Sequence, residues 1–191
     1  MDQLRKSDWV VIPVSLKTAR RLVETYHYAR SATNTRVYTH GLFRKGEESS
    51  EDNCKGIAWW LPPTMLAAQA SYPGDWRKVL SLTRMVIVPD VPKNAASFLL
   101  SRSVKLIDNE KWHCLVTYAD TWQNHTGTIY KASNWEYMGL TRATPVYRSP
   151  EGKMMGKKRG LTSYSEQEMA DMGFENLGKF RKHKFRLLIN G

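Results

Sequence analysis

The segment from residue 118 to residue 139 groups polar side chains that can transfer protons. It reads YADTWQNHTGTIYKASNWEYMG and contains Asp120, His125 and Tyr130. A carboxylate and an imidazole within one loop can pass a proton to or from a reacting group. An isolated pair of this kind more often has a structural role, in which Asp120 caps a helix and His125 lies at the surface. The residues alone leave both interpretations open.

A second group of reactive side chains lies in the segment TYHYARSATNTR. It combines His27 and Tyr28 with the cations Arg30 and Arg36. Imidazole, phenol and guanidinium suit either acid–base work or the binding of a phosphate. The alternative is that Tyr26 packs in the core and the others are solvated. His27 and Tyr28 could also ligate iron or zinc, but no second His or carboxylate stands at ligand spacing, so a metal site is the minority interpretation.

A third candidate is the helix start in TRMVIVPDVPKNAAS, where a strand runs into a loop and then a helix. The first amides of a helix have no internal partner, and the helix dipole is positive there, so such an end binds anions such as pyrophosphate. Lys93 adds charge, Asn94 is a candidate cap, and the small Ala95 and Ser97 allow a ligand to approach. An ordinary helix start is the alternative. The segment has no Walker or dinucleotide-binding glycine pattern.

Composition favours a polyanionic partner. The 191 residues include 29 Lys and Arg against 18 Asp and Glu, a net charge of +11 with a pI near 9.7. This balance is typical of nucleic-acid-binding proteins, although a solvated basic surface has the same composition. The sequence shows no transmembrane run and no secretory signal, and its two cysteines match no zinc or redox spacing. We therefore expect a cytoplasmic protein that does not contact a membrane.

The basic residues concentrate after residue 141, where cations alternate with aromatic residues. Such a pattern suits a phosphate backbone and an unstacked base, whereas a basic edge strand that avoids aggregation is the plain alternative. With Arg30 and Arg36, the candidate nucleic-acid-binding residues are Arg148, Lys157, Lys158, Arg159, Lys182 and Lys184.

Apolar periodicity and turn residues predict the order of elements. Helices are expected within 14–31 (capped by Ser15), 91–110, 126–134 and 163–173, the last from a capping box of Ser165 and Glu168. Strands are expected within 36–43, 54–63, 80–90, 113–120, 135–141 and 178–191, the first two as a hairpin. Residues 64–80 have no clear periodicity. Strand–helix–strand crossovers indicate a mixed α/β sheet with a parallel central pair.

This order resembles the acetyltransferase (GNAT-like) fold, a strongly twisted mixed sheet with flanking helices. In that superfamily a central strand leads into a helix whose N-terminus holds a cofactor pyrophosphate. GTIYKASNWEYMG is similar to its closing pattern of a tyrosine, an aromatic residue after a short helix, and a strand ending in glycine. The glycine-rich pyrophosphate loop is replaced here by PDVPKNAAS. We expect one domain over 1–191, with a core at about 8–141 and a segment 142–191 that completes the sheet and the DNA-binding surface.

A narrower resemblance covers about residues 26 to 188. YHYARS, LTRMVIVPDVPKNAASFLLSRSVKLI, VTYADTWQNHTGTIYKASNWEYMG and KFRKHKFRLL resemble the phage Mom family in sequence and in order. That family places a carbamoylmethyl group on the exocyclic N6 of adenine in phage DNA, which protects the DNA from host restriction. The resemblance implies a phage or prophage DNA hypermodification enzyme of transferase type.

The resemblance carries over residue by residue. It marks His27 and Tyr28, Arg84 on the central strand, and Ser97 facing the donor. It also marks Asp120, His125 and Tyr130, of which Asp120 or His125 would accept a proton from N6 while Tyr28, Tyr130 or Trp122 stacks on the base. Because N6 is paired in a duplex, the adenine must flip out of double-stranded DNA, at a cost of a few kcal/mol.

The donor and the assembly state remain open in the sequence. An activated glycyl or acyl donor is expected, with acyl-coenzyme A and iron as candidate cofactors and a dimer as a candidate assembly. Two other functions fit the same residues. One is an acyl-CoA-dependent N-acetyltransferase acting on a protein or small amine, and the other is a non-catalytic DNA-binding protein.

Overall fold

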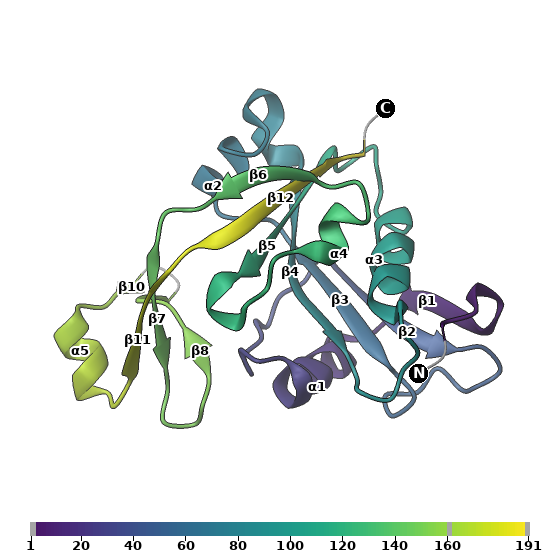
Figure 1. Ribbon diagram of the computed structural model, residues 1–191, viewed down its shortest axis with the longest axis horizontal. Helices are drawn as coiled ribbons and strands as arrows, with labels where there is room; N and C mark the ends of the chain where they lie inside the picture. The colour runs from purple at the N-terminus through teal and green to yellow at the C-terminus, as the bar shows by residue number, and fades with distance from the viewer. Residues whose placement is uncertain (1–2, 160–161, 190–191) are drawn as a thin grey trace.

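A seven-stranded sheet forms the centre of the molecule (Figure 1). The computed structural model describes residues 3–159 and 162–189, with Arg159 described by its backbone only. The strands, in spatial order, are β1 (Trp9–Pro13), β2 (Tyr38–Arg44), β3 (Gly56–Leu61), β4 (Val79–Ile87), β5 (Cys114–Asp120), β12 (Lys182–Leu188) and β6 (Glu136–Leu140). Among these seven strands, only β4 and β5 pair in parallel. The predicted mixed α/β sheet with a parallel central pair is therefore confirmed.

The helices are short and begin at local signals that the sequence carries. They are α1 (Leu16–Tyr26), α2 (Met65–Gln69), α3 (Ala95–Lys105), α4 (Thr128–Lys131) and α5 (Glu166–Asp171). The Ser15 hydroxyl accepts the Thr18 amide at the start of α1, and the predicted capping box opens α5. Asn94 occupies the N-cap of α3 but makes no capping bond, because its backbone is left-handed at φ 70°. The 64–80 segment forms α2 and a 3₁₀ turn, Pro73–Lys78.

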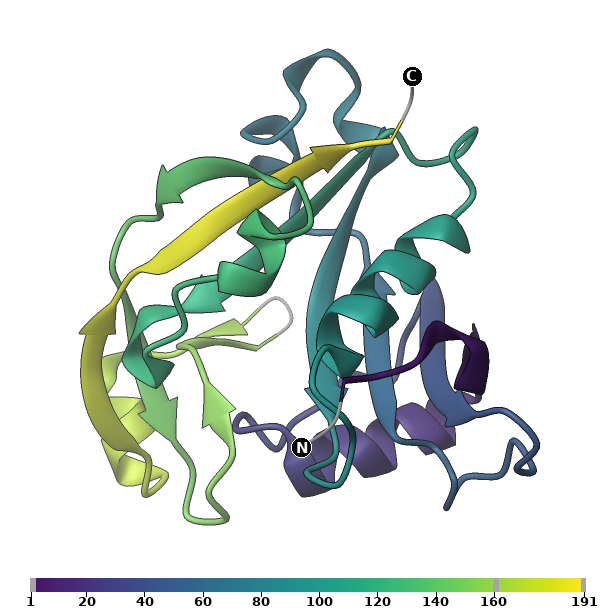
Figure 2. The same cartoon turned by 45° about the vertical axis from the view of Figure 1, so that its right-hand side comes forward.

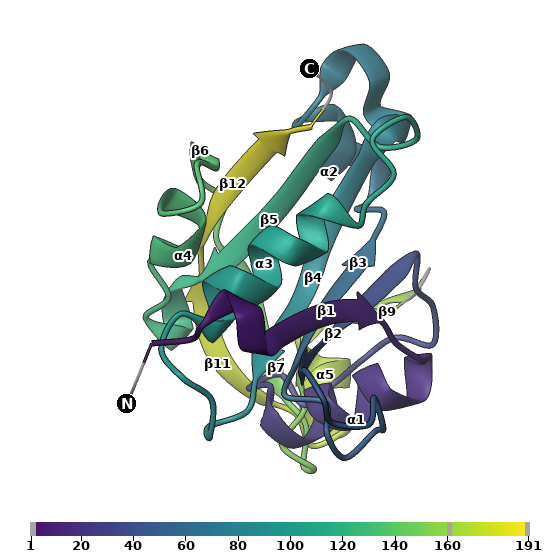
Figure 3. The ribbon, with the colours of Figure 1, turned by 90° about the vertical axis from the view of Figure 1, so that its right-hand side faces the viewer.

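The two faces of the sheet bury separate apolar cores. On one face, Phe98, Leu99 and Leu100 of α3 pack against Leu80 and Leu82 of β4. On the other, Ala19, Leu22 and Val23 of α1 pack against Trp59 and Val86. Figure 3 shows α3 and α1 in these positions. The alternative in which Tyr26 packs in the core is wrong. Tyr26 stands at the last turn of α1 and is 49% exposed, so it does not join the second core.

The sheet splits between its two parallel strands. β4 and β5 pair only from Val79 to Leu82, opposite Cys114 to Thr117. Beyond that point β4 remains paired with β3, whereas β5 remains paired with β12 as far as Asp120. Each strand follows its outer neighbour, so the two diverge (Figure 2). The edge of β4 from Thr83 to Ile87 therefore faces an opening in place of a neighbouring strand.

A bulge in β4 decides which residues face that opening. Trp59 pairs with Arg84 but Trp60 pairs with Leu82, so Thr83 is an extra residue. One extra residue exchanges the two faces of a strand. Leu80 and Leu82 accordingly face α3, whereas Arg84 faces α1. Without the bulge, Arg84 would point into the apolar core beneath α3.

The segment after residue 141 forms a second, three-stranded sheet beside the split. It contains β7 (Thr144–Arg148), β8 (Met154–Met155) and β11 (Glu175–Phe180), next to α5 and a small hairpin of β9 (Lys158–Arg159) and β10 (Thr162–Ser163). We call residues 144–180 the C-terminal lobe (Figure 1, left). β1 and most of these strands were not predicted, because they are short. The predicted strand 178–191 includes the last three residues of β11, and the structure divides it at Arg181 into β11 and β12. β11 continues into β12, which inserts between β5 and β6.

Candidate active site

A cavity of about 1640 Å³ occupies the split between β4 and β5. Its walls come from the ends of both strands, the end of α1, the rim of α2 and the loop that follows β5. The residues predicted for catalysis meet here although they lie up to 103 positions apart in the chain. All five line the cavity: His27, Tyr28, Asp120, His125 and Tyr130. The cavity is also lined by Arg84, which was predicted to hold the cofactor, and by Lys182 and Lys184, which were predicted to bind nucleic acid.

Asp120 lies at the centre of a short polar chain. The Tyr28 hydroxyl donates a hydrogen bond to Asp120 Oδ2. Lys182 Nζ lies 2.7 Å from Asp120 Oδ1. The Asp120 side chain is only 10% exposed and does not cap the 3₁₀ turn that follows it. The capping role that the sequence left open for Asp120 is therefore not the one it has.

Tyr28 is held as a neutral phenol. Burial raises its pKa, and the neighbouring Asp120 carboxylate raises it further by charge and hydrogen bonding. A neutral phenol donates its proton to the carboxylate while its oxygen can still accept another hydrogen bond. His125 and Trp122 each place a ring edge-on to the Tyr28 ring, at centroid distances of 5.7 and 5.8 Å. Two aromatic rings from the segment after β5 thus flank the phenol.

His27 is uncharged at neutral pH. Burial lowers its pKa to about 3, and the nearby positive charge of Arg84 lowers it as well. Its Nδ1 accepts the Ala29 backbone amide at 3.0 Å, which puts the proton of the neutral ring on Nε2. The bond also turns the chain sharply after α1. That turn brings the Tyr28 side chain, which follows His27, toward Asp120.

Arg84 is a cation at the cavity wall without a carboxylate in salt-bridge range among the described residues. Its Nε donates to the Ser31 carbonyl at 3.1 Å, and one terminal nitrogen donates to the Thr83 carbonyl at 2.8 Å. Burial lowers its pKa, an effect that Tyr28 and Asp120 partly oppose. A guanidinium that is held by carbonyls and faces a cavity keeps donors for a ligand oxygen.

Tyr130 approaches the cavity from the α3 face. Its phenol is paired with the Thr117 hydroxyl, and burial raises its pKa. Its ring packs against Phe185 and Trp135, at centroid distances of 5.3 and 5.7 Å. Gly127, three residues earlier, has φ +71°, and a methyl group there would overlap the Phe185 ring. The loop after β5 can therefore press against β12 only because this residue is glycine.

The predicted anion site at the start of α3 lies partly at the cavity. Ala96 lines the cavity, whereas Lys93, Asn94, Ala95 and Ser97 are not among its lining residues. The Ser97 hydroxyl donates to the Asn94 carbonyl at 2.9 Å, and the Lys93 carbonyl accepts the Leu4 amide at 3.1 Å. The side chains predicted to hold a cofactor therefore divide between Arg84 inside the cavity and the α3 start at its edge.

Most of the predicted nucleic-acid-binding cations have partners within the chain. Arg36 donates to the Val14 carbonyl and to Thr39, and Lys184 donates to the Ala70 carbonyl. Arg148 pairs with Glu175, and Lys157 with Glu166. Lys158 stands in β9, and the side chain of Arg159 lies outside the described part of the chain.

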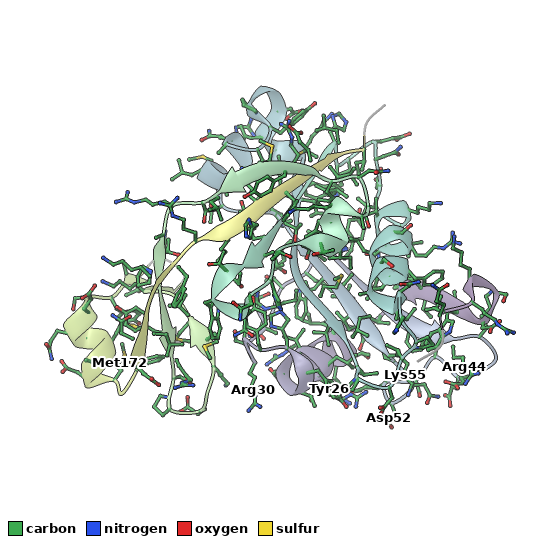
Figure 4. All side chains as sticks on the ribbon, viewed as in Figure 1. Tyr26, Arg30, Arg44, Asp52, Lys55 and Met172 are labelled. Atoms are coloured by element: carbon green, nitrogen blue, oxygen red, sulfur yellow. The ribbon has the colours of Figure 1, made fainter. Side chains whose placement is uncertain are left out.

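Arg30 is exposed, and it points outward between α1 and the C-terminal lobe (Figure 4). Reasoning from the sequence did not single out Arg142, which lines the cavity, or Arg181, which directly precedes Lys182. Both were noticed only as members of a basic tail. Neither side chain has an ion pair or hydrogen bond within the described residues.

Residues 3–159 and 162–189 contain no group of three or more His, Cys, Asp or Glu side chains placed to hold a metal ion. The candidate iron site at His27 and Tyr28 thus has no ligand set there. In the same ranges, no helix combines the length and the apolar character needed to cross a membrane.

A model of the Mom protein family matches residues 8–189. The chain belongs to the Mom family. One curated relative, the methylcarbamoylase mom of Escherichia phage Mu, is 27% identical over 138 residues, which are 69% of this chain and 54% of that protein. The chain thus matches about half the length of this relative.

Solved acetyltransferases share the fold of this Mom-family chain. The ribosomal-protein-S18-alanine N-acetyltransferase of Escherichia coli superposes with a TM-score of 0.58 at 9% identity, covering 96% of this chain and 95% of the other. NAA60 of Arabidopsis thaliana, solved with acetyl-CoA, gives a TM-score of 0.57 at 11% identity, covering 96% and 99%. The predicted GNAT-like fold is confirmed.

Proposed function

We propose that this protein modifies the exocyclic N6 amine of adenine in DNA by adding a carbamoylmethyl group, and that it thereby protects phage or prophage DNA from restriction. The observation that supports this most directly is the Tyr28–Asp120 pair, placed in the cavity of a Mom-family chain. A carboxylate joined to a neutral phenol can take a proton from an amine that is itself a weak nucleophile. The +11 net charge supports a polyanionic substrate.

The proton has a defined route in this proposal. As the N6 nitrogen forms a bond to the donor carbon, the donor's leaving group departs with its electron pair. The Tyr28 oxygen accepts the N6 proton while its own proton moves to Asp120 Oδ2, with which it is already hydrogen-bonded. Arg84 stays charged and donates hydrogen bonds to an oxygen of the transferred group. His27, neutral and fixed at Nδ1, holds the turn that positions Tyr28.

The size and shape of the cavity suit two ligands at once. Single-ligand pockets measure roughly 300–1,000 Å³, and this cavity of about 1640 Å³ is larger. It extends from Tyr28 and Arg84 on the α1 face to Tyr130 on the α3 face. An adenine flipped from the duplex would enter beside Tyr28 and Trp122, whose rings supply stacking surfaces. The donor would then occupy the opposite side.

Acyl-coenzyme A fits the second half of the cavity. From Thr83 to Ile87, β4 has no neighbouring strand on the cavity side, so its backbone groups can bond to the amides of an extended ligand. The first amides of α3, beside Ala96, can hold a pyrophosphate. When bound, this cofactor would supply an activated acyl group, and direct transfer of that group to N6 would give an amide. The carbamoylmethyl product needs a donor that carries its leaving group on the CH2 carbon that bonds to N6, with its carbonyl oxygen within reach of Arg84.

Nucleoside analysis tests the proposed function. DNA from cells that express the protein is digested to nucleosides and examined by mass spectrometry, with Asp120→Asn as the control. We expect the mass of N6-carbamoylmethyl-2′-deoxyadenosine in the wild-type sample and its loss in the control. Unmodified adenine in cells with abundant folded wild-type protein would overturn the proposal.

An N-acetyltransferase acting on a protein or small amine is the second candidate, favoured by the acetyl-CoA-bound structures that share the fold. It predicts that purified protein transfers acetyl groups from acetyl-CoA to peptide or amine acceptors without DNA. A non-catalytic DNA-binding role predicts neither product, and it predicts that Asp120→Asn changes no phenotype. The two assays together separate the three functions.

A further inference from the structure

The first residue of β12 reaches into the cavity and contacts Asp120. In the β5–β12 ladder Lys182 pairs directly with Asp120. Directly opposed residues of an antiparallel pair point to the same face. Lys182 therefore faces the same side as Asp120, and its Nζ lies 2.7 Å from Asp120 Oδ1. The register of the β5–β12 pair places these two side chains next to each other.

With this contact, each oxygen of the Asp120 carboxylate has a partner. Oδ2 accepts the Tyr28 hydroxyl, and Oδ1 is occupied by Lys182. No other cation of the described residues forms a salt bridge with Asp120. The carboxylate is 10% exposed whereas the lysine side chain is 41% exposed, so most of the desolvation falls on Asp120. An ionised carboxylate in such a position needs a compensating charge.

The other cations of β12 on this face have different partners. Lys184 donates to the Ala70 carbonyl, and Arg186 to Glu136 and the Ser71 carbonyl. Both support the segment that follows α2. Within β12, only Lys182 contacts a residue of the polar chain that includes Tyr28.

We propose that Lys182 is a positioning residue that holds Oδ1 of Asp120 and thereby directs Oδ2 toward the Tyr28 hydroxyl. The position of Lys182 in a basic tail predicts that it binds DNA phosphates. In this proposal its side chain acts through Asp120 instead. The inference rests on the proposed function, because Tyr28 and Asp120 must act on a substrate for Lys182 to matter to catalysis. It also assigns the C-terminal lobe a part in the site, since that lobe leads directly into Lys182.

Substitutions at Lys182 test this role by activity and by pH dependence. Lys182→Met is compared with Lys182→Arg, and with Lys17→Met as a control that removes an ion-paired lysine outside the cavity. We expect Lys182→Met to lower the yield of modified adenine at least about tenfold, part of the 10²–10⁴-fold that a positioned base supplies. Lys182→Arg retains the charge and should restore most of that yield. Lys17→Met should match the wild type.

The pH profile separates a charge effect from a loss of packing. Loss of the lysine charge beside Asp120 should change the shape of the activity profile in Lys182→Met, whereas a loss of packing alone would lower activity equally at every pH. Lys182→Arg should keep the wild-type profile. A uniform loss of activity at every pH in Lys182→Met would contradict the inference.

A DNA-binding titration distinguishes the two roles of the lysine. If Lys182 contacts a phosphate, Lys182→Met should lower the slope of log affinity against log salt by about one. We expect Lys182→Met and the wild type to have the same slope of log affinity against log salt, with binding to duplex DNA measured by fluorescence anisotropy. A slope that falls by about one, with an activity loss that disappears at saturating DNA, would overturn the inference.

A double-mutant cycle keeps the inference testable if the proposed function fails. Wild-type protein that leaves adenine unmodified contradicts the proposed function, and the Lys182–Asp120 coupling is then read from urea unfolding. Asp120→Asn, Lys182→Met and the double variant should be non-additive in stability, with Lys182→Met costing little once Asp120 is neutral. Additive effects would show that the two side chains are not coupled, and would overturn the inference.

Discussion

At the scale of single residues, the site depends on one hydrogen-bonded pair and on a set of charges around it. One Asp120 oxygen accepts the Tyr28 hydroxyl, and the other pairs with Lys182. Arg84 stands close enough to affect the pKa values of His27 and Tyr28. Burial keeps His27 neutral and Tyr28 protonated. The groups therefore occupy the protonation states in which a phenol can relay a proton to a carboxylate at neutral pH.

Removal of the Tyr28 hydroxyl should abolish the relay without unfolding the protein. In Tyr28→Phe, the proton of N6 has no oxygen through which to reach Asp120, so we expect a loss of modified adenine of about 10²-fold or more. Mass spectrometry of nucleosides measures it. Tyr137→Phe is the matched control, because Tyr137 lies outside the cavity and bonds to His183 at 2.9 Å. Equal activity in Tyr28→Phe and the wild type would contradict the relay.

The buried histidines should make the protein less stable in acid. The folded state keeps His27 neutral to a pKa of about 3, and His40, also buried, to a pKa of about 4, whereas an unfolded histidine takes up a proton near pH 6.5. Between these values the unfolded state binds more protons, so stability is fully present above about pH 6.5 and falls as pH falls. Each histidine contributes a slope of at most about 1.4 kcal/mol per pH unit.

Urea unfolding from pH 7 to pH 5 measures this slope. We expect His27→Gln to reduce the slope of stability against pH by up to about 1.4 kcal/mol per pH unit relative to the wild type, because the glutamine side chain binds no proton. Comparison of the two proteins removes the contributions of carboxylates, which are common to both. Parallel stability curves for the wild type and His27→Gln would show that the imidazole is not held neutral.

At the scale of elements, the site is built by irregularities in regular structure. The bulge at Thr83 turns Arg84 from the α3 face to the α1 face, and the Thr83 hydroxyl holds the bulge by donating to the Trp59 carbonyl at 3.1 Å. The split of β4 from β5 opens the cavity to which Arg84 turns. The left-handed Gly127 brings the loop that carries His125 against Phe185.

Alanine substitutions at three glycines separate the two features of Gly127, its left-handed backbone and its contact with the Phe185 ring. Gly127→Ala meets both a left-handed backbone and the Phe185 ring, so we expect a loss of about 2–4 kcal/mol in the free energy of unfolding. Gly139→Ala has φ +89° but nothing within 4 Å, so about 1 kcal/mol is expected. Gly74→Ala has neither feature and should be close to neutral. Urea titrations measure all three, and equal losses at Gly127 and Gly139 would exclude a role for the Phe185 contact.

At the scale of the whole molecule, the C-terminal lobe closes one side of the site. The Met154 amide donates to the Ala29 carbonyl at 3.0 Å, and the Ser31 hydroxyl contacts the Met154 carbonyl at 3.4 Å. The lobe thus holds the turn that carries Tyr28, while the strand that follows it carries Lys182. Because Arg142 and Arg181 flank the lobe at its two connections to the main sheet, a DNA duplex gripped there would lie at the cavity entrance.

Arg181 and Arg142 are the cations that we expect to contact DNA phosphates. Arg181→Gln and Arg142→Gln should each weaken duplex binding and lower the slope of log affinity against log salt by about one. Lys17→Gln is the control, since Lys17 pairs with Glu51 at the opposite end of α1 from Tyr26. Fluorescence anisotropy at several salt concentrations measures the slopes. Wild-type slopes in both arginine variants would place the DNA elsewhere.

Local signals in the sequence were sufficient for most strands of the main sheet and for the helices other than α2, whose segment shows no clear periodicity. Ser15 and the Ser165–Glu168 box mark helix starts through bonds within three residues, and the apolar runs of β3, β4 and β5 mark buried strands. The family resemblance brought His27, Tyr28, Arg84, Asp120 and Tyr130 together as a set. β1 and most of the C-terminal lobe were missed. β1 and β7 pair with segments further along the chain, and β8, β9 and β10 have only two residues each, too few to show a period.

The tertiary structure alone decided which contacts these residues make. Asp120 looks the same in the sequence whether it caps a turn or accepts the Tyr28 hydroxyl, since the choice depends on where the fold places Tyr28, 92 residues earlier. Lys182 looks like its neighbours in a basic tail, and only its register opposite Asp120 distinguishes it. Residue type and local spacing determine which chemistry is available. Strand register, one bulge and one split in the sheet determine which groups share a cavity, because those features depend on pairing between distant segments.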